Sequence, residues 1–179
     1  DMTSSLVGSE MCIRDSLSAV LICAIHEEIP RSRQKKPVAL MVPVNLRNYF
    51  PSQSMGNFFG WIEVGYTFSE NSTFKDVVDE VKKQFETELV KEKIAEHMSG
   101  YVRLEKNPVI RAVPLEVKRY FLILGAELGS RSITSVYSNI GVIRLPEEYR
   151  DYIARFGFFA STDSLQLCSC SYGDELLLG

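Results

Sequence analysis

Two apolar runs separated by a short polar segment give the strongest constraint on the fold of this chain. Residues 37–44 are rich in Val, Leu and Met, and they lead directly into Asn45 and Arg47. A second apolar run begins after Gly56 and Asn57. Such runs predict two neighbouring, largely buried β-strands. Because polar groups at the ends of buried strands need hydrogen bonds, these residues are either structural clamps or the lining of a ligand channel.

Helical periodicity flanks this strand pair. Apolar residues recur at helical spacing over residues 17–28, and Pro30 ends that pattern. Thr73 and Asp76 resemble a capping box at the start of an amphipathic helix that extends to Leu89. The rest of the chain predicts helical stretches that open at Pro108 and restart at Pro114, and strands over residues 132–137, 155–160, 165–171 and 175–178.

The order of these elements defines the expected fold class. A helix, two strands, two helices and a run of strands predict an α/β (α+β) chain, with a mixed β-sheet and helices mainly on one face. The length of 179 residues fits one ordinary domain or half of a larger one. A net charge of −3 without a basic stripe argues against nucleic-acid binding. No uncharged apolar run reaches about 18 residues, so no transmembrane segment is expected.

The cysteines and histidines carry no pattern of a metal site or a nucleophilic site. Cysteines at these spacings are expected to be free thiols in a reducing compartment, which favours the cytoplasm. They are Cys12, Cys23, Cys168 and Cys170. His26 lies near a helix end and His97 lies in a charged segment. Neither has a neighbouring nucleophile and a third orienting group, so no catalytic residue is expected in this chain.

A polar pair, Ser138-Asn139, directly follows the expected strand over residues 132–137. Side chains at a strand end can donate to a developing oxyanion or bind a ligand amide. Taken alone, however, the pair is better interpreted as a capped turn with Gly141 at positive φ. Gly157, between two phenylalanines, indicates a bulge or a close backbone approach in a strand.

Five short motifs, in their order and spacing, resemble the C-terminal half of the CoA-dependent acyltransferase superfamily. The motifs are Asn45-Leu46-Arg47, Gly56-Asn57, Ser138-Asn139-Ile140-Gly141, Phe156-Gly157 and Tyr172-Gly173-Asp174. This superfamily includes chloramphenicol acetyltransferase and condensation domains, and the chain most resembles bacterial alcohol acetyltransferase-type proteins. The resemblance covers essentially everything after Leu17. It implies one half of a two-subdomain chloramphenicol-acetyltransferase-like fold, with a tunnel between the halves.

The resemblance also implies a reaction. Such enzymes transfer an acyl or acetyl group from acyl-CoA or acetyl-CoA, or from an acyl carrier, to an alcohol or amine acceptor. They use no metal and form no covalent enzyme intermediate. Their general base is a histidine in an HHxxxDG motif of the N-terminal half, and this chain has no such motif. It is therefore expected to be inactive alone, with the missing N-terminal half as its partner. The alternative is a non-catalytic module of the same fold that binds an acyl group or a carrier protein.

The resemblance assigns roles residue by residue. Positions expected to contact substrate are Asn57, Ser138 and Asn139. Structural positions at the tunnel are Asn45, Arg47, Gly56, Gly141 and Gly157, with Arg47 expected to act as a clamp. Arg155 stands where the plant enzymes carry Asp in their Asp-Phe-Gly region.

Residues 1–16 are expected to be foreign to the fold. The segment over residues 6–16 has no amphipathic period and resembles the translation of a transposon-type sequencing-adapter end, so we predict that it is non-native. A natural disordered tail is the alternative. Residues 17–179 are then predicted to be one acyltransferase subdomain. Because the apolar run at residues 176–178 stops in mid-pattern, truncation is expected at both ends.

Overall fold

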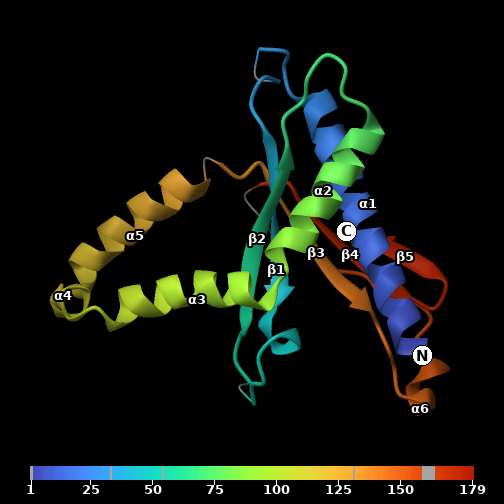
Figure 1. Cartoon of the computed structure of the whole chain (residues 1–179). Coiled ribbons are helices and arrows are strands. Elements are labelled where there is room, and N and C mark those ends of the chain that lie inside the picture. The colour runs from blue at the N-terminus through green and yellow to red at the C-terminus, as the bar shows by residue number, and fades with distance from the viewer. Residues whose placement is uncertain (1, 33, 54, 131, 159–163) are drawn as a thin grey trace.

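The computed structural model describes residues 2–32, 34–53, 55–130, 132–158 and 164–179. Within these ranges the chain forms one mixed sheet of five strands, in the order β2-β1-β3-β4-β5 (Figure 1). The strands are β1 (Val38–Asn45), β2 (Phe59–Tyr66), β3 (Ser135–Val142), β4 (Gln166–Tyr172) and β5 (Glu175–Leu178). The helices are α1 (Met2–Glu28), the 3-10 turn η1 (Leu46–Asn48), α2 (Phe74–Glu88), α3 (Lys91–Lys106), α4 (Pro108–Ala112), α5 (Leu115–Ser130) and α6 (Glu147–Arg150). The expected mixed α/β fold class is confirmed.

Strand direction decides which side chains meet at each edge of the sheet. β1 pairs with β2 in antiparallel orientation, β1 and β3 are parallel, β3 and β4 are parallel, and β5 returns antiparallel to β4. The carboxyl ends of the three parallel strands β1, β3 and β4 therefore lie at the same end of the sheet. Ligand sites of open α/β sheets form outside the carboxyl ends of parallel strands.

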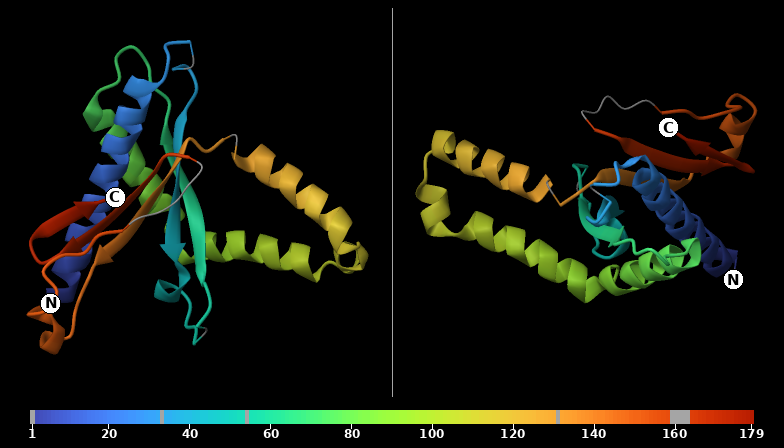
Figure 2. Two further views of the ribbon diagram at one scale, coloured as in Figure 1. Left: turned by 180° about the vertical axis from the view of Figure 1, so that it is seen from behind. Right: turned by 90° about the horizontal axis from the view of Figure 1, so that it is seen from above.

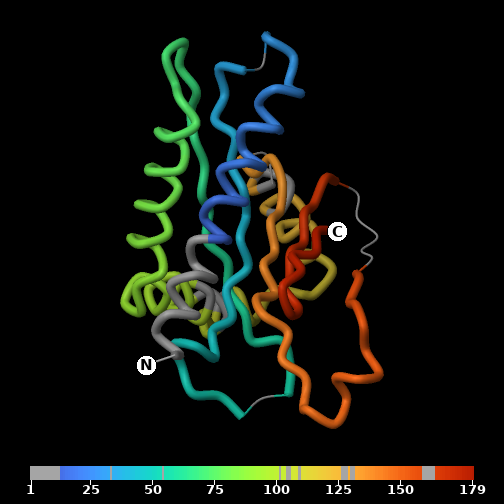
Figure 3. The backbone as a smooth tube through the Cα atoms, turned by 90° about the vertical axis from the view of Figure 1, so that its right-hand side faces the viewer, coloured from blue at the N-terminus to red at the C-terminus, as the bar shows by residue number. Residues whose placement is uncertain are grey.

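Helices α1 and α2 cover one face of the sheet and form the core with it (Figures 1, 2 and 3). Alternate residues of β1 point to this face and are buried, as in Leu40 and Val42, which lie opposite Val64 and Ile62 of β2. α2 contributes the stripe Val77, Val81 and Phe85. The expected capping box at the start of α2 is present, because Thr73 and Asp76 bond each other's backbone N–H groups.

The free edge of β2 is protected by a side chain of α2. Gln84 accepts a hydrogen bond from Gly65 N at 2.8 Å and donates one to Gly65 O at 3.0 Å. The amide thus replaces a strand partner at an otherwise open edge. Position 65 requires glycine, because a Cβ there would lie 2.6 Å from Val38 O.

Helices α3, α4 and α5 form an arm that projects away from the sheet (Figure 2). The arm is joined to the sheet at the start of α3. Ile94 of α3 is buried there and lines a small cavity together with Leu46 and Ile62. Most apolar side chains of α5 are exposed, and Tyr120 and Phe121 reach exposed fractions of 76% and 69%. In the described part of the chain, no helix is both long and apolar enough to cross a membrane.

Strand β3 continues further than the sequence predicted. Ser138 and Asn139 were expected to follow the strand, but they lie inside β3 and pair with Cys168 and Ser169 of β4. The register shifts between Asn139 and Gly141, which has a φ of 84°. The positive φ expected for this glycine is present, but it accommodates a β-bulge and not a turn.

The structure also defines two other expected elements. Helix α1 runs from Met2 to Glu28, and the helical pattern expected over residues 17–28 forms its C-terminal part. The Arg14 guanidinium also stacks on Phe85 of α2, at 3.9 Å from the ring centroid. The expected strand over residues 155–160 is not formed at residues 155–158, which have no regular structure, and residues 159–160 lie outside the described ranges.

Candidate functional site

A recess lies at the carboxyl end of β1 and beside the second half of β3, bounded by the segment that joins β1 to β2. Its volume is about 460 Å³. It is lined by Pro43, Val44, Asn45, Arg47, Met55, Gly56, Asn57, Phe58, Phe59, Ser138, Asn139 and Ile140. Six residues predicted from the sequence are therefore brought together here, from segments far apart in the chain. They are Asn45, Arg47, Gly56, Asn57, Ser138 and Asn139.

Arg47 holds one wall of the recess in place. Its Nη2 donates a hydrogen bond to Gly56 O at 2.7 Å, and its guanidinium carbon lies 5.9 Å from the ring centroid of Phe58. Asn45 Oδ1 accepts a hydrogen bond from Arg47 N at 3.1 Å and so caps η1. These contacts join η1 to the start of β2 and leave Asn57 exposed between them.

Asn139 is part of a hydrogen-bonded chain that supports the bulge in β3. Its Oδ1 accepts hydrogen bonds from Gly141 N at 3.0 Å and from Ser169 Oγ at 3.2 Å. Ser169 Oγ also lies 2.9 Å from the hydroxyl oxygen of Tyr137, and both of these residues are buried. Burial raises the pKa of the Tyr137 phenol, so this hydroxyl is neutral at physiological pH and serves as a hydrogen-bonding group. The Asn139 amide NH₂ group is the part of the side chain suited to donate to a ligand.

Ser138 is half-buried and lines the recess. It neighbours Asn139 in β3, so the two side chains leave the strand on opposite faces. Ser138 and Asn57 add a hydroxyl and an amide to the lining. The recess therefore combines neutral hydrogen-bond donors with apolar surface from Phe58, Phe59 and Ile140.

Acid–base groups lie elsewhere in the described structure. Arg47 is the ionisable side chain among the described lining residues, and it is engaged with Gly56. His26 stacks on Phe68 with ring centroids 3.8 Å apart, and His97 lines the small cavity at the base of α3. Among the described residues, no group of three or more His, Cys, Asp or Glu side chains could hold a metal. Cys23, Cys168 and Cys170 are free thiols.

The other predicted glycines do not line the recess. Gly141 lies just beyond it, in the bulge that Asn139 supports. Gly157 lies apart, in the irregular segment where Phe156 packs edge-on against Tyr172 at a centroid distance of 4.9 Å. The predicted grouping of Gly157 with the tunnel residues is therefore not seen within this chain.

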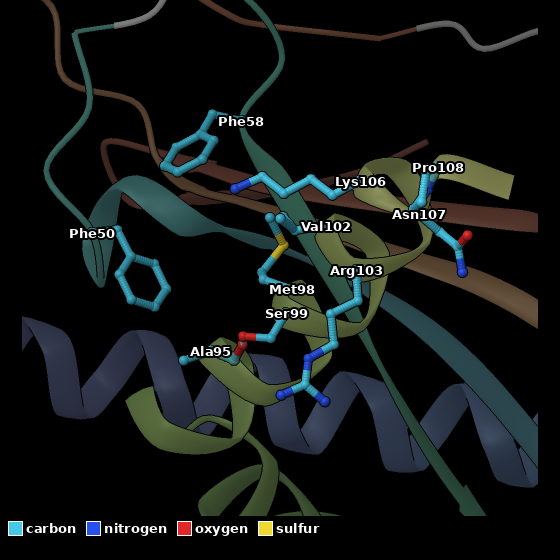
Figure 4. Close-up of a pocket in the computed structure, with 10 residues that line it drawn as sticks. All are labelled: Phe50, Phe58, Ala95, Met98, Ser99, Val102, Arg103, Lys106, Asn107 and Pro108. Carbon is cyan, nitrogen blue, oxygen red and sulfur yellow. Dashed lines mark hydrogen bonds between the residues drawn. The ribbon is translucent and has the colours of Figure 1, made fainter. Parts of the chain in front are cut away.

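Sequence reasoning missed a second hollow, which we call the α3 groove (Figure 4). It lies between α3 and the segment that joins β1 to β2, and its volume is about 700 Å³. It is lined by Phe50, Phe58, Ala95, Met98, Ser99, Val102, Arg103, Lys106, Asn107 and Pro108. Phe58 lines both hollows and separates them. The signal in the sequence was slight, because it consisted of two basic residues three positions apart, Arg103 and Lys106.

Comparisons of the chain with protein-family models, with curated proteins and with solved structures found no match. The recess, its hydrogen bonds and its position on the sheet are therefore the basis for a functional proposal.

Proposed function

We propose that the recess is one wall of an acyl-transfer site, and that this chain is the non-catalytic half of a CoA-dependent acyltransferase. The donor would be acyl-CoA or acetyl-CoA, or an acyl carrier, and the acceptor an alcohol or amine. One observation carries the proposal: the motifs around Asn45, Asn57 and Ser138 line a single recess at the carboxyl end of β1, beside the parallel strand β3.

The chemistry of the lining fits acyl transfer from a thioester. The acceptor oxygen or nitrogen attacks the thioester carbonyl carbon, and a general base from the other half of the protein takes its proton. The carbonyl oxygen gains negative charge, which Asn57 and Ser138 can stabilise by donating hydrogen bonds. The Asn139 amide leaves β3 on the opposite face and would contact another part of the substrate. Collapse of the tetrahedral intermediate breaks the carbon–sulfur bond, and the leaving thiolate receives the proton from the base.

A second candidate is a binding module of the same fold. The lining favours a binding module in one respect, namely the lack of a general base among its described residues. The ionisable side chain there is Arg47, and its guanidinium donates a hydrogen bond to Gly56 O. Such a module would bind an acyl donor without turning it over. The two candidates differ in the other half of the protein, since an HHxxxDG motif there means an enzyme.

Calorimetric titration of the purified chain with acetyl-CoA tests the donor site that both candidates share. We expect saturable binding, weakened about 2–10-fold by Asn57→Ala or Ser138→Ala, because each substitution removes one neutral hydrogen bond. Thr87→Ala is the matched control, since its hydroxyl donates to Lys83 O on α2, outside the recess. Absence of binding, or equal affinities in all variants, would contradict the proposal.

Turnover separates the enzyme from the binder. When the chain is joined to a half that carries the base, Ser138→Ala should lower kcat more than it raises KM, because the contact is made chiefly in the transition state. An unchanged kcat would leave Ser138 with a structural role only.

A further inference from the structure

The walls of the α3 groove are fixed by the fold and do not depend on a ligand. Phe50 is held by a hydrogen bond from its backbone N to Leu46 O at 2.8 Å. Phe58 lies beside the guanidinium of Arg47, whose hydrogen bond to Gly56 secures the same segment. The opposite wall is α3, which the buried Ile94 anchors to the sheet.

The two walls of the groove present an apolar strip to each other. Met98 and Val102 lie one helical turn apart on the same side of α3, and Phe50 and Phe58 face them (Figure 4). The lining runs along α3 from Ala95 to the end of the helix, a length of about 16 Å at the α-helical rise. A flexible methionine and two aromatic rings along an open strip of this length suit a linear alkyl chain. The volume of about 700 Å³ lies within the usual range of small-molecule sites.

Positive charge flanks this strip. Figure 4 shows Lys106 reaching across the groove towards Phe58, whereas Arg103 extends along the other side beside Ser99. Lys91 adds a third cation, with its ammonium 5.7 Å from the ring centroid of Phe50. Of the lining residues that the structure describes, none is acidic, although the chain as a whole carries a net charge of −3. The groove is therefore complementary to an anion with an apolar body.

We propose that the α3 groove binds a medium-chain aliphatic carboxylate. The alkyl chain lies on Phe50, Phe58, Met98 and Val102, and the carboxylate lies beside Lys106, with Arg103 adding positive charge along the other side of the groove. A carboxylate accepts charge-assisted hydrogen bonds from an ammonium group. This site is separate from the recess and does not rest on the acyl-transfer proposal.

Decanoate is the probe, and the ¹³C-labelled methyl group of Met98 is the reporter. We expect a saturable shift of the Met98 methyl signal, while the methyl of Met41 in β1 serves as an internal reference. The paired substitution Arg103→Gln with Lys106→Gln should raise the Kd about tenfold or more, since hydrogen bonds to charged groups are lost. The paired substitution Lys118→Gln with Arg119→Gln removes the same charge from α5, outside the groove lining, and should leave the Kd unchanged.

Three related probes decide which chemistry is recognised. Decanol and decyltrimethylammonium should bind at least tenfold more weakly than decanoate, because they lack the negative charge. Decyl phosphate tests the alternative anion, and a clear preference for it would replace the carboxylate with a phosphate ester. An unshifted Met98 methyl group would overturn the proposal. So would equal binding of decanol and decanoate, or a Kd indifferent to loss of Arg103 and Lys106.

Discussion

Helices α2 and α5 are both rich in apolar residues, yet the two regions use them in opposite ways. α2 places Val77, Val81 and Phe85 on one stripe and buries them against the sheet. α5 carries apolar residues on most of its circumference and leaves Tyr120 and Phe121 largely exposed. A helix with a one-sided stripe completes a core within its own chain, whereas one that is apolar all round requires cover from another surface. The α1–α2 side should therefore determine the stability of the fold, and the arm should contribute little to it.

Removal of one large aromatic ring from each region should have very different effects on stability. Phe85→Ala should lower the free energy of unfolding by about 3–5 kcal/mol, because it leaves a cavity under α2 and removes the surface on which Arg14 stacks. Phe121→Ala should change it by less than about 0.5 kcal/mol. Denaturant unfolding followed by circular dichroism measures both, and similar losses would mean that the arm belongs to the core.

Glycines in the two regions give a second comparison. Gly65→Ala should cost about 1–3 kcal/mol, because the new Cβ meets the Val38 carbonyl oxygen and disturbs the Gln84 contact at the edge of β2. Gly125→Ala meets nothing within 4 Å in α5 and should stabilise the helix by up to about 1 kcal/mol. Thermal unfolding of the two variants should therefore shift in opposite directions, and a shift in the same direction would contradict this account.

The hydrogen-bonded chain behind the recess should have an intermediate effect. Tyr137→Phe removes one hydroxyl from the Tyr137–Ser169–Asn139 chain and should cost about 1 kcal/mol of stability. Tyr152→Phe is the matched control, because Tyr152 is 84% exposed. A loss in Tyr137→Phe no larger than in the control would show that the chain does not support the bulge.

The smallest expected effect concerns Asp15, and it depends on pH. Burial raises the pKa of this carboxyl above its ordinary value of 3.8, although the Arg14 guanidinium opposes the shift. The folded state thus binds the proton more tightly than the unfolded state, so the contribution of Asp15 to stability falls as pH rises through the interval above 3.8. Asp15→Asn should therefore stabilise the chain slightly at pH 7, by less than about 1 kcal/mol, and much less at pH 3.

The pKa of Asp76 is shifted in the opposite direction, so its substitution should have the opposite effect on stability. Hydrogen bonds from the Thr73 backbone and side chain lower the pKa of the Asp76 carboxyl below 3.8. Its contribution is present above that value and is lost as pH falls through the lowered pKa. Asp76→Asn should thus destabilise the chain at pH 7, which unfolding at two pH values would detect. If both aspartates responded with the same sign, the assigned burial of Asp15 would be wrong.

The sequence predicted those parts of the molecule that depend on local periodicity and capping. The β1–β2 pair, the capping box at Thr73 and the strands β4 and β5 follow from alternation, helical spacing and turn residues. The inclusion of Ser138 and Asn139 in β3 did not follow, because a glycine with positive φ suits a turn and a bulge equally, and pairing with β4 decides between them. The strand expected at residues 155–158 had the right composition but did not gain a pairing partner.

The recess and the α3 groove also differ in how far the sequence predicts them. The recess residues stand out in the sequence because polar groups at the ends of buried strands are costly unless they are bonded. The α3 groove arises only from the placement of α3 against the segment around Phe50, which the packing of Ile94 determines. Long-range packing of this kind leaves little trace in one sequence. The foreign origin predicted for residues 1–16 stays a prediction.

Residue-resolved NMR titration with acetyl-CoA would show whether the recess binds an acyl thioester. We predict saturable amide shifts that cluster at Asn57, Ser138 and Asn139, with a single Kd that Ser138→Ala increases. Amide signals of α5 should stay in place. A titration that leaves these three amides unshifted, or that shifts only residues of the α3 groove, would contradict the account.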